Sequence, residues 1–137
     1  MIVLVDTNIL LDVLQRRQPF HIWPDQIWKM AETGGLEAHI SAISFNNVFY
    51  VLRKQAGQQV AIGAVKQLRK IFRVVGLDEA LIDEAINMAA QDFEDAIQAA
   101  SAQRVNADVI VTRNIKHFVV FGIRALSSED FVATYVP

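Results

Sequence analysis

The chain has 137 residues, of which 53% are apolar and 20% are charged, and its formal net charge is −2. This length predicts a single domain spanning residues 1–137, and the apolar content is enough for a packed core. The absence of cysteine excludes disulfide scaffolds, cysteine-zinc sites and thiol catalysis, while the near-balance of charge excludes a uniformly basic surface but allows a local basic patch.

The first elements are read from the spacing of apolar residues. Residues 2–5 are continuously apolar and rich in β-branched side chains, which predicts a central parallel strand covered on both faces. Apolar residues on one face predict helices over about 9–14 and from Trp23 to the Gly34-Gly35 pair. We then expect a strand at 37–41, a helix capped by Ser44, and a helix over about 58–71.

The second half of the chain continues the alternation of strands and helices. It predicts strands at 72–75, 108–111 and 122–125, helices over about 78–91 and 92–104, and a last helix capped within 127–130. This order implies right-handed crossovers and a parallel sheet between helical layers, an α/β class. Since the longest stretch without Asp, Glu, Lys or Arg is too short to span a bilayer, and the N-terminus lacks signal-peptide features, we expect a soluble cytoplasmic protein with no membrane partner.

Ligands of such sheets bind beyond the carboxyl ends of the strands, so polar residues there are candidates for a site. Asp6 directly follows the first strand, where it can cap a helix, face the crevice, or do both with its two oxygens. Asp92 and Asp95 share a helix face at i, i+3 spacing, and Glu94 is expected to point elsewhere. Capping and the helix dipole also account for much of this acidic cluster.

If Asp95 faces the same crevice as Asp6, the two carboxylates repel each other and require a cation. Oxygen ligands with retained waters suit Mg²⁺ or Mn²⁺. After the fourth strand, Thr112 and Asn114 form either a simple turn or part of this site, with Asn114 ligating a metal-bound water and Thr112 holding nearby backbone. No motif for nucleotide cofactors or serine hydrolases is present in the sequence.

Four segments together resemble a PIN domain of the VapC-like toxin type. They are Val3-Leu4-Val5-Asp6-Thr7-Asn8-Ile9-Leu10, Ile40-Ser41-Ala42-Ile43-Ser44, Asp95-Ala96-Ile97-Gln98-Ala99-Ala100-Ser101-Ala102 and Val111-Thr112-Arg113-Asn114. The resemblance covers nearly the whole chain and implies an α/β/α sandwich with a five-stranded parallel sheet in the order 3-2-1-4-5. It also implies Mg²⁺- or Mn²⁺-dependent endoribonuclease activity, an antitoxin partner and a dimer.

The resemblance also assigns roles to individual residues. Asp6 and Asp95 match two of the family's acids and would be the metal ligands, and Asn114 matches a fourth position where Asp or Asn is usual. Asp92 would be an outer ligand or orient a water, and Thr7 and Asn8 would fix the first turn. The chain departs from the family where a Glu is usual, because Asn47 stands there and brings no charge, and Asp92 or Glu94 could partly substitute for it.

Cations should surround an acidic pocket that attracts a polyanion. The candidates for RNA contact are Arg16, Arg17, Arg53, Lys54, Arg113 and Lys116, each of which also fits a solvated surface. Among the histidines only His117 lies near a candidate site residue. Phe20, Trp23, Trp28 and Met30 fit core packing or, as the resemblance suggests, a groove for a partner helix.

These observations lead to a principal hypothesis and alternatives. The first is a metal-dependent endoribonuclease that is the toxin of a type II toxin–antitoxin pair. The second, motivated by Asn47, is a catalytically weakened PIN-like domain that binds RNA or protein. An aspartyl-phosphate phosphatase or a receiver domain is disfavoured, because the former needs an Asp where Asn8 stands and the latter needs acids that the first and third strands lack.

Overall fold

The computed structural model describes residues 1–136, and its centre is a five-stranded sheet in which every pair of neighbours is parallel. The strand order β3-β2-β1-β4-β5 confirms the predicted topology. The strands are β1 (Ile2–Val5), β2 (Glu37–Ser41), β3 (Arg73–Val75), β4 (Val109–Val111) and β5 (Ala125–Leu126).

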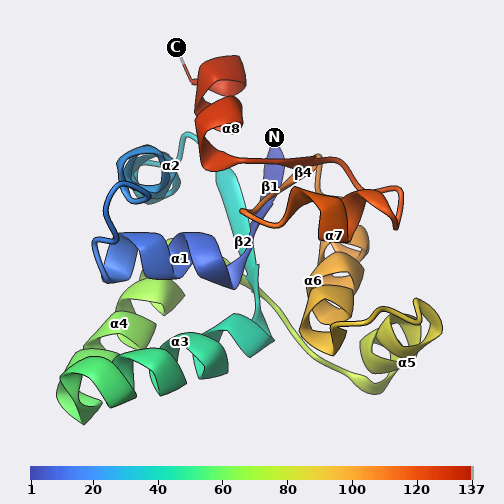
Figure 1. Ribbon diagram of the computed structural model, residues 1–137, viewed down its shortest axis with the longest axis horizontal. Helices are drawn as coiled ribbons and strands as arrows, with labels where there is room; N and C mark the ends of the chain where they lie inside the picture. Colours follow the sequence, from blue (N-terminus) through green and yellow to red (C-terminus); the bar gives the residue numbers. More distant parts are fainter. Residues whose placement is uncertain (137) are drawn as a thin grey trace.

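Helices cover both faces of the sheet, which confirms the α/β/α sandwich (Figure 1). They are α1 (Thr7–Leu14), α2 (Ile22–Glu32), α3 (Ala42–Ala56), α4 (Gln58–Ile71), α5 (Glu79–Asn87), α6 (Phe93–Arg104), α7 (Ile115–Val119) and α8 (Ser128–Tyr135). Within residues 1–136, none of these helices is both long and apolar enough to cross a membrane.

The two faces of the sheet form two hydrophobic cores. Val3 and Val5 of β1 pack into the core shared by α1 to α4 and α8, whereas Leu4 between them packs into the core shared by α5 to α7. All three side chains are at most 1% exposed, because successive side chains of a strand point to opposite faces. The apolar run of β1 therefore follows from its central position between two helical layers.

Helix α6 packs closely on the sheet. Ala96, Ala99 and Ala100 are fully buried, so the small side chains let the helix backbone approach the strands. The buried surface of α6 nevertheless includes the polar side chains of Asp95, Gln98 and Ser101. Buried polar groups need hydrogen-bond partners, and the partners of Asp95 and Gln98 belong to the candidate site.

The prediction that Ser44 caps the helix after β2 is wrong. The helix begins at Ala42, and its cap is Ser41, whose Oγ accepts a hydrogen bond from the backbone N–H of Ile43. Ser44 lies inside the first turn and is fully buried. The strand thus passes directly into the helix, and the side chain of Ser44 is free for tertiary contacts.

Three other expectations also differ from the structure. Helix α5 ends at Asn87, about four residues early, and Ala89 just beyond it adopts a positive φ of 51°. Strand β5 lies at Ala125–Leu126, at the end of the predicted range, and the short helix α7 was not predicted. Five residues are too few for an apolar period to stand out, which explains the omission of α7.

Candidate active site

Three separate segments converge at the carboxyl edge of the sheet. Asp6 follows β1 and Thr112 follows β4, and these strands are neighbours. Helix α6 leads into the parallel strand β4, so it runs opposite to the strands and its N-terminal residues Asp92 and Asp95 lie at the same edge. The crossover connectivity therefore brings together residues that are about ninety positions apart.

Asp6 is held in one position by backbone and side-chain donors. Its Oδ1 accepts a hydrogen bond of 2.7 Å from the backbone N–H of Thr7, which makes Asp6 the N-cap of α1. Its Oδ2 accepts 2.7 Å from the hydroxyl of Thr112 and 3.4 Å from Nδ2 of Asn8. Capping and a position in the crevice are therefore compatible in this carboxylate.

The environment of Asp6 disfavours its negative charge. Its side chain is almost wholly buried, and this burial raises its pKa from 3.8 to about 7, with further increases from the charges of Glu94 and Asp95. The hydrogen bonds from Thr112 and Thr7 lower the pKa but do not offset burial. Asp6 is thus a carboxylate that lacks a counter-charge.

The expectation that Glu94 points away from the site is wrong. Its Oε1 accepts a hydrogen bond of 3.3 Å from the Thr7 hydroxyl and one of 3.1 Å from Nε2 of Gln98. Gln98 Nε2 also donates to Thr7 Oγ1 and Ser44 Oγ, and these two hydroxyls are 2.8 Å apart. This buried network turns Glu94 toward the segment that carries Asp6.

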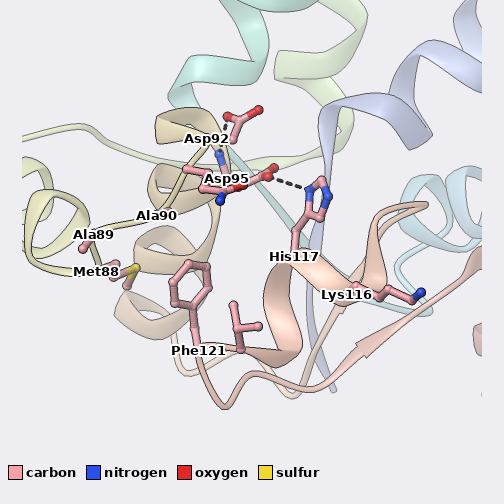
Figure 2. A pocket seen from close by; sticks show the side chains of 10 residues that line it. Met88, Ala89, Ala90, Asp92, Asp95, Lys116, His117 and Phe121 are labelled. Atoms are coloured by element: carbon pink, nitrogen blue, oxygen red, sulfur yellow. Dashed lines mark hydrogen bonds and ion pairs between the residues drawn. The ribbon is translucent and has the colours of Figure 1, made fainter.

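Asp95 lies at the N-terminus of α6 beside two other carboxylates. One ligand oxygen each of Asp92, Glu94 and Asp95 lies within 4.8 Å of the others. Burial, and then the charge of Asp92, raises the pKa of Asp95, whereas its hydrogen bond with His117 lowers it. His117 Nδ1 lies 2.7 Å from Asp95 Oδ2, and Figure 2 marks this contact by a dashed line.

Asp92 and Asp95 also stabilise the start of the helix. The Asp92 carboxylate accepts a hydrogen bond of 3.2 Å from the backbone N–H of Asp95 and caps α6. The cap therefore exists, but it uses the Asp92 side chain and leaves the buried carboxylate of Asp95 facing His117. Capping alone does not account for the whole cluster.

The donor set fits a divalent cation. It consists of carboxylate oxygens of Asp6, Asp92, Glu94 and Asp95, and Mg²⁺ and Mn²⁺ prefer oxygen ligands of this kind. Among the described residues 1–136, no lysine or arginine forms an ion pair with Asp6, Glu94 or Asp95, and the basic side chain in contact with Asp95 is His117. Clustered carboxylates without a lysine or arginine partner raise one another's pKa, and a divalent ion relieves this repulsion.

The three predicted asparagines differ in what they contact. Asn8 links two loops, because its Nδ2 donates to Asp6 and its Oδ1 accepts from the backbone N–H of Arg113. Asn114 is exposed, and its backbone N–H donates 3.0 Å to Thr112 Oγ1. Asn47 is half-buried on α3. Thr112 thus holds neighbouring backbone as expected, and in addition donates to Asp6.

Two of the predicted RNA-contact residues are tied to a buried acid instead of extending freely. Arg17 Nη1 lies 3.6 Å and Arg113 Nε lies 3.3 Å from the carboxylate of Asp12, a fully buried residue of α1. The Arg113 guanidinium also lies over the Phe20 ring, 4.9 Å from its centroid. Burial is the main cause that raises the pKa of Asp12, and the two arginines oppose it.

The other cationic candidates differ in their relation to the acids. Arg16 is exposed after α1, and Arg53 and Lys54 are exposed in the last turn of α3, where Lys54 lies 4.7 Å from the Tyr50 ring. Lys116 is exposed on α7 and lines a cavity together with Asp95 and His117. Lys116 is therefore the candidate that the structure places beside the acidic cluster.

The aromatic group around α2 is divided between core and surface. Trp28 is 6% exposed and packs edge-on against Phe72, and Met30 is half-buried against the same core. Phe20 and Trp23 are exposed. Core packing and a surface role, stated above as alternatives, thus apply to different members of the group.

Sequence reasoning missed the residues that position Glu94. Ser44 and Gln98 are fully buried polar residues, and their spacing in the sequence resembles ordinary polar positions of a helix. One signal was available, because Gln98 falls between the alanines Ala96, Ala99 and Ala100 of one helix. A polar residue on a buried face indicates a partner, but the sequence does not say which one.

The fold and the clustered carboxylates together define an α/β/α domain with an acidic site at the carboxyl edge of its sheet. Residues 2–116 match the family described as PIN domain, so the chain belongs to the PIN domain family. Ribonuclease VapC1 of Aquifex aeolicus (strain VF5) is 25% identical to it over 134 residues, which cover 94% of this chain and 92% of that protein.

Solved structures share the same fold. The DNA-bound VapBC of Salmonella typhimurium has a TM-score of 0.74 at 17% identity, covering 93% of this chain and 98% of that one. VapC20 of Mycobacterium tuberculosis, described as a Sarcin-Ricin loop cleaving toxin, has a TM-score of 0.71 at 16% identity, covering 88% and 95%. The resemblance drawn from the four sequence segments is thereby confirmed.

Proposed function

We propose that this protein is a divalent-metal-dependent endoribonuclease and the toxin of a toxin–antitoxin pair. The observation that carries the proposal is the cluster of Asp92, Glu94 and Asp95 beside the buried Asp6, whose pKa is raised to about 7 by burial and by the charges of Glu94 and Asp95. Within residues 1–136, no lysine or arginine is paired with these acids, and the basic side chain in contact with Asp95 is His117. Membership of the PIN domain family and the similarity to a ribonuclease support the same activity.

The residues that would hold Mg²⁺ or Mn²⁺ are Asp6, Glu94 and Asp95, with Asp92 binding directly or through a water. A bound ion would supply an activated water for attack on phosphorus and would offset the charge that develops on the scissile phosphate. Neighbouring residues of the protein hold the ligating carboxylates in place. Thr112 and the backbone of Thr7 orient both oxygens of Asp6, so that its carboxylate needs no rearrangement before binding.

Glu94 takes over the charge that Asn47 does not bring. Two hydrogen bonds from Thr7 and Gln98 hold one of its oxygens, and its charge acts on Asp6. Three carboxylates are thus available without residue 47. This placement favours an active enzyme over the alternative, a weakened domain that only binds RNA or protein.

His117 would act on Asp95 rather than on the substrate directly. The contact of 2.7 Å between the His117 ring and Asp95 Oδ2 fixes one carboxylate oxygen and leaves the other free to bind. Such partners of ligating carboxylates orient them and adjust their affinity. Asn114, which is exposed at the start of α7, would face bound water or RNA at the margin of the site.

The proposed partners follow from the relatives. Several structures with this fold are VapBC complexes, and we infer that this chain also binds an antitoxin protein and acts in the cytoplasm, where its RNA substrate is found. The exposed Phe20 and Trp23 near α2 are candidates for this contact. We further propose that residues 1–137 act as one domain and that the chain forms a homodimer.

The experiment measures RNA cleavage and Mn²⁺ binding in parallel for the same variants. Asp95→Asn and Glu94→Gln are expected to reduce cleavage at least about a hundredfold and to weaken Mn²⁺ binding in calorimetry, because several kcal/mol of charge stabilisation are lost. Asp83→Asn is the matched control, since Asp83 is an exposed acid on α5 outside the cluster.

The outcomes separate the candidate functions. Loss of cleavage in the two variants but not in the control supports the nuclease. Loss with Asp95→Asn alone would contradict the role given to Glu94. If the natural protein binds RNA without cleaving it and Asn47→Glu creates cleavage, the weakened binding domain is correct instead.

A further inference from the structure

A cavity of about 490 Å³ adjoins the acidic cluster between the α5–α6 connection and α7. Its volume is within the range of small-molecule sites, roughly 300–1,000 Å³. Figure 2 shows Met88 and the ring of Phe121 on its apolar side, with Asp95 and His117 at its polar edge. The apolar part of its lining consists of Met88, Ala89, Ala90, Val120 and Phe121.

The requirements of folding explain only part of this lining, because Met88, Ala90 and Phe121 pack against the core of α5 to α7. The side chain of Val120 is 75% exposed, and Ala89 is also exposed, although both belong to the cavity wall. Apolar groups that remain in contact with water beside charged groups contribute little to stability, and a concave apolar surface of this kind is typical of a binding site. A ligand of this cavity would contact both its apolar walls and its charged edge.

We propose that the cavity binds one unpaired base of the RNA substrate, from a nucleotide next to the phosphate that is cleaved. This inference rests on the function proposed above and extends it to single-stranded RNA or loops. A nucleobase has apolar faces and polar edges, which match an apolar wall bordered by polar groups. Sequence recognition in RNA mostly uses such unstacked bases, which stack on aromatic side chains.

The position of the cavity determines which part of the RNA enters it. Asp95 belongs both to the acidic cluster and to the cavity wall, so a phosphate at the cluster places a neighbouring base at the cavity. Phe121 offers the aromatic face for stacking. Lys116 also lines the cavity, and its side chain lies on the far side of His117 from Asp95 in Figure 2, where it would meet the next phosphate. A base that remains paired in a helix cannot enter.

A partner protein is the competing occupant, because an apolar side chain of an antitoxin would also fill part of this space. The charged edge disfavours it. Asp92, Asp95, His117 and Lys116 form that edge, and an apolar side chain offers them no hydrogen-bond partner. A ribonucleotide uses both the apolar and the polar parts of the lining.

The test compares cleavage of a short single-stranded RNA with cleavage of the same RNA carrying an abasic site next to the scissile phosphate. The natural protein should cleave the intact RNA about tenfold faster in kcat/KM, since stacking of one base contributes about that factor. In Phe121→Leu, which keeps an apolar side chain but removes the aromatic ring, this preference should disappear. Val119→Ala is the control, because Val119 is exposed on α7 and does not line the cavity.

Binding provides a second readout that does not depend on cleavage. In the Asp6→Asn background, 2-aminopurine at the same RNA position should lose fluorescence on binding through stacking, and Phe121→Leu should abolish this loss. Equal cleavage of the intact and abasic RNAs would overturn the inference while leaving the nuclease in place. If Phe121→Leu weakens binding of the antitoxin but leaves RNA cleavage unchanged, the cavity holds a protein side chain, and the inference is wrong. Failure to cleave or bind any RNA would overturn the proposed function itself.

Discussion

Replacement of Asp6 by Asn should stabilise the metal-free protein at neutral and alkaline pH. In the folded state the Asp6 carboxyl is buried near Glu94 and Asp95, and its pKa is raised to about 7, whereas its ordinary value is 3.8. The neutral form is therefore favoured by folding. Ionisation of Asp6 costs free energy of folding, and the uncharged amide of Asn avoids that cost.

The magnitude follows from the difference of about three pKa units. Each unit corresponds to about 1.4 kcal/mol, so the ionised Asp6 lowers the free energy of unfolding by about 4 kcal/mol at pH 8. Because folding raises the pKa of this carboxyl, its ionisation destabilises the folded state. The destabilisation is absent below pH 3.8, grows as the pH rises, and is complete above about pH 7. At pH 5 it is about 2 kcal/mol.

Urea unfolding in the presence of a chelator measures this difference. The advantage of Asp6→Asn over the natural protein should grow by about 2 kcal/mol from pH 5 to pH 8. The amide can still accept the hydrogen bond from Thr7, which keeps the cap of α1. Added Mn²⁺ should then stabilise the natural protein more than the variant, because an ion that binds only the folded state raises its stability.

The dependence on pH is the feature that can refute this reasoning. An advantage of Asp6→Asn that is equal at pH 5 and pH 8 would mean that the carboxyl of Asp6 titrates normally in the folded state. A variant that is less stable at both pH values would show that its hydrogen bond from Thr112 outweighs the repulsion within the cluster.

The remaining predictions concern residues that support the site. Thr112→Val removes the hydroxyl that donates to Asp6 Oδ2, so we expect the affinity for Mn²⁺ to fall by about tenfold in calorimetry. An unchanged affinity would contradict the role of Thr112 in holding that carboxylate. Asp12→Ala leaves Arg17 and Arg113 without their shared carboxylate and should lower the free energy of unfolding by about 2 kcal/mol in urea titrations. A stability equal to that of the natural protein would show that the cost of burying Asp12 cancels the gain from its two ion pairs.

Much of the fold could be predicted from local patterns. The run from Ile2 to Val5 is apolar at every position, which identifies a strand buried on both faces, and β2 was predicted with its observed bounds. The ends of helices that depend on a single capping side chain could not be predicted as well. Ser41 and Ser44 are equally suitable caps, and only the direct passage from β2 into α3 selects Ser41.

Part of the candidate site was also predictable from local patterns. Asp6 directly follows a strand, and a residue in that position lies at the carboxyl edge of a parallel sheet in any fold of this class. The orientation of Glu94 was not predictable from its spacing, which separates it from the face shared by Asp92 and Asp95. Gln98 and Thr7 determine it through hydrogen bonds to side chains that are distant in sequence.

The sequence alone thus determined the order of the strands and of every helix except α7, the acids at their junctions and the likeness to PIN domains, because these depend on neighbours along the chain. Tertiary structure decided which side chains share a partner. It joined Asp95 to His117, placed Arg17 and Arg113 on Asp12, and opened a cavity beside the acids. Such contacts depend on how the elements pack in space, and local periodicity carries no information about them.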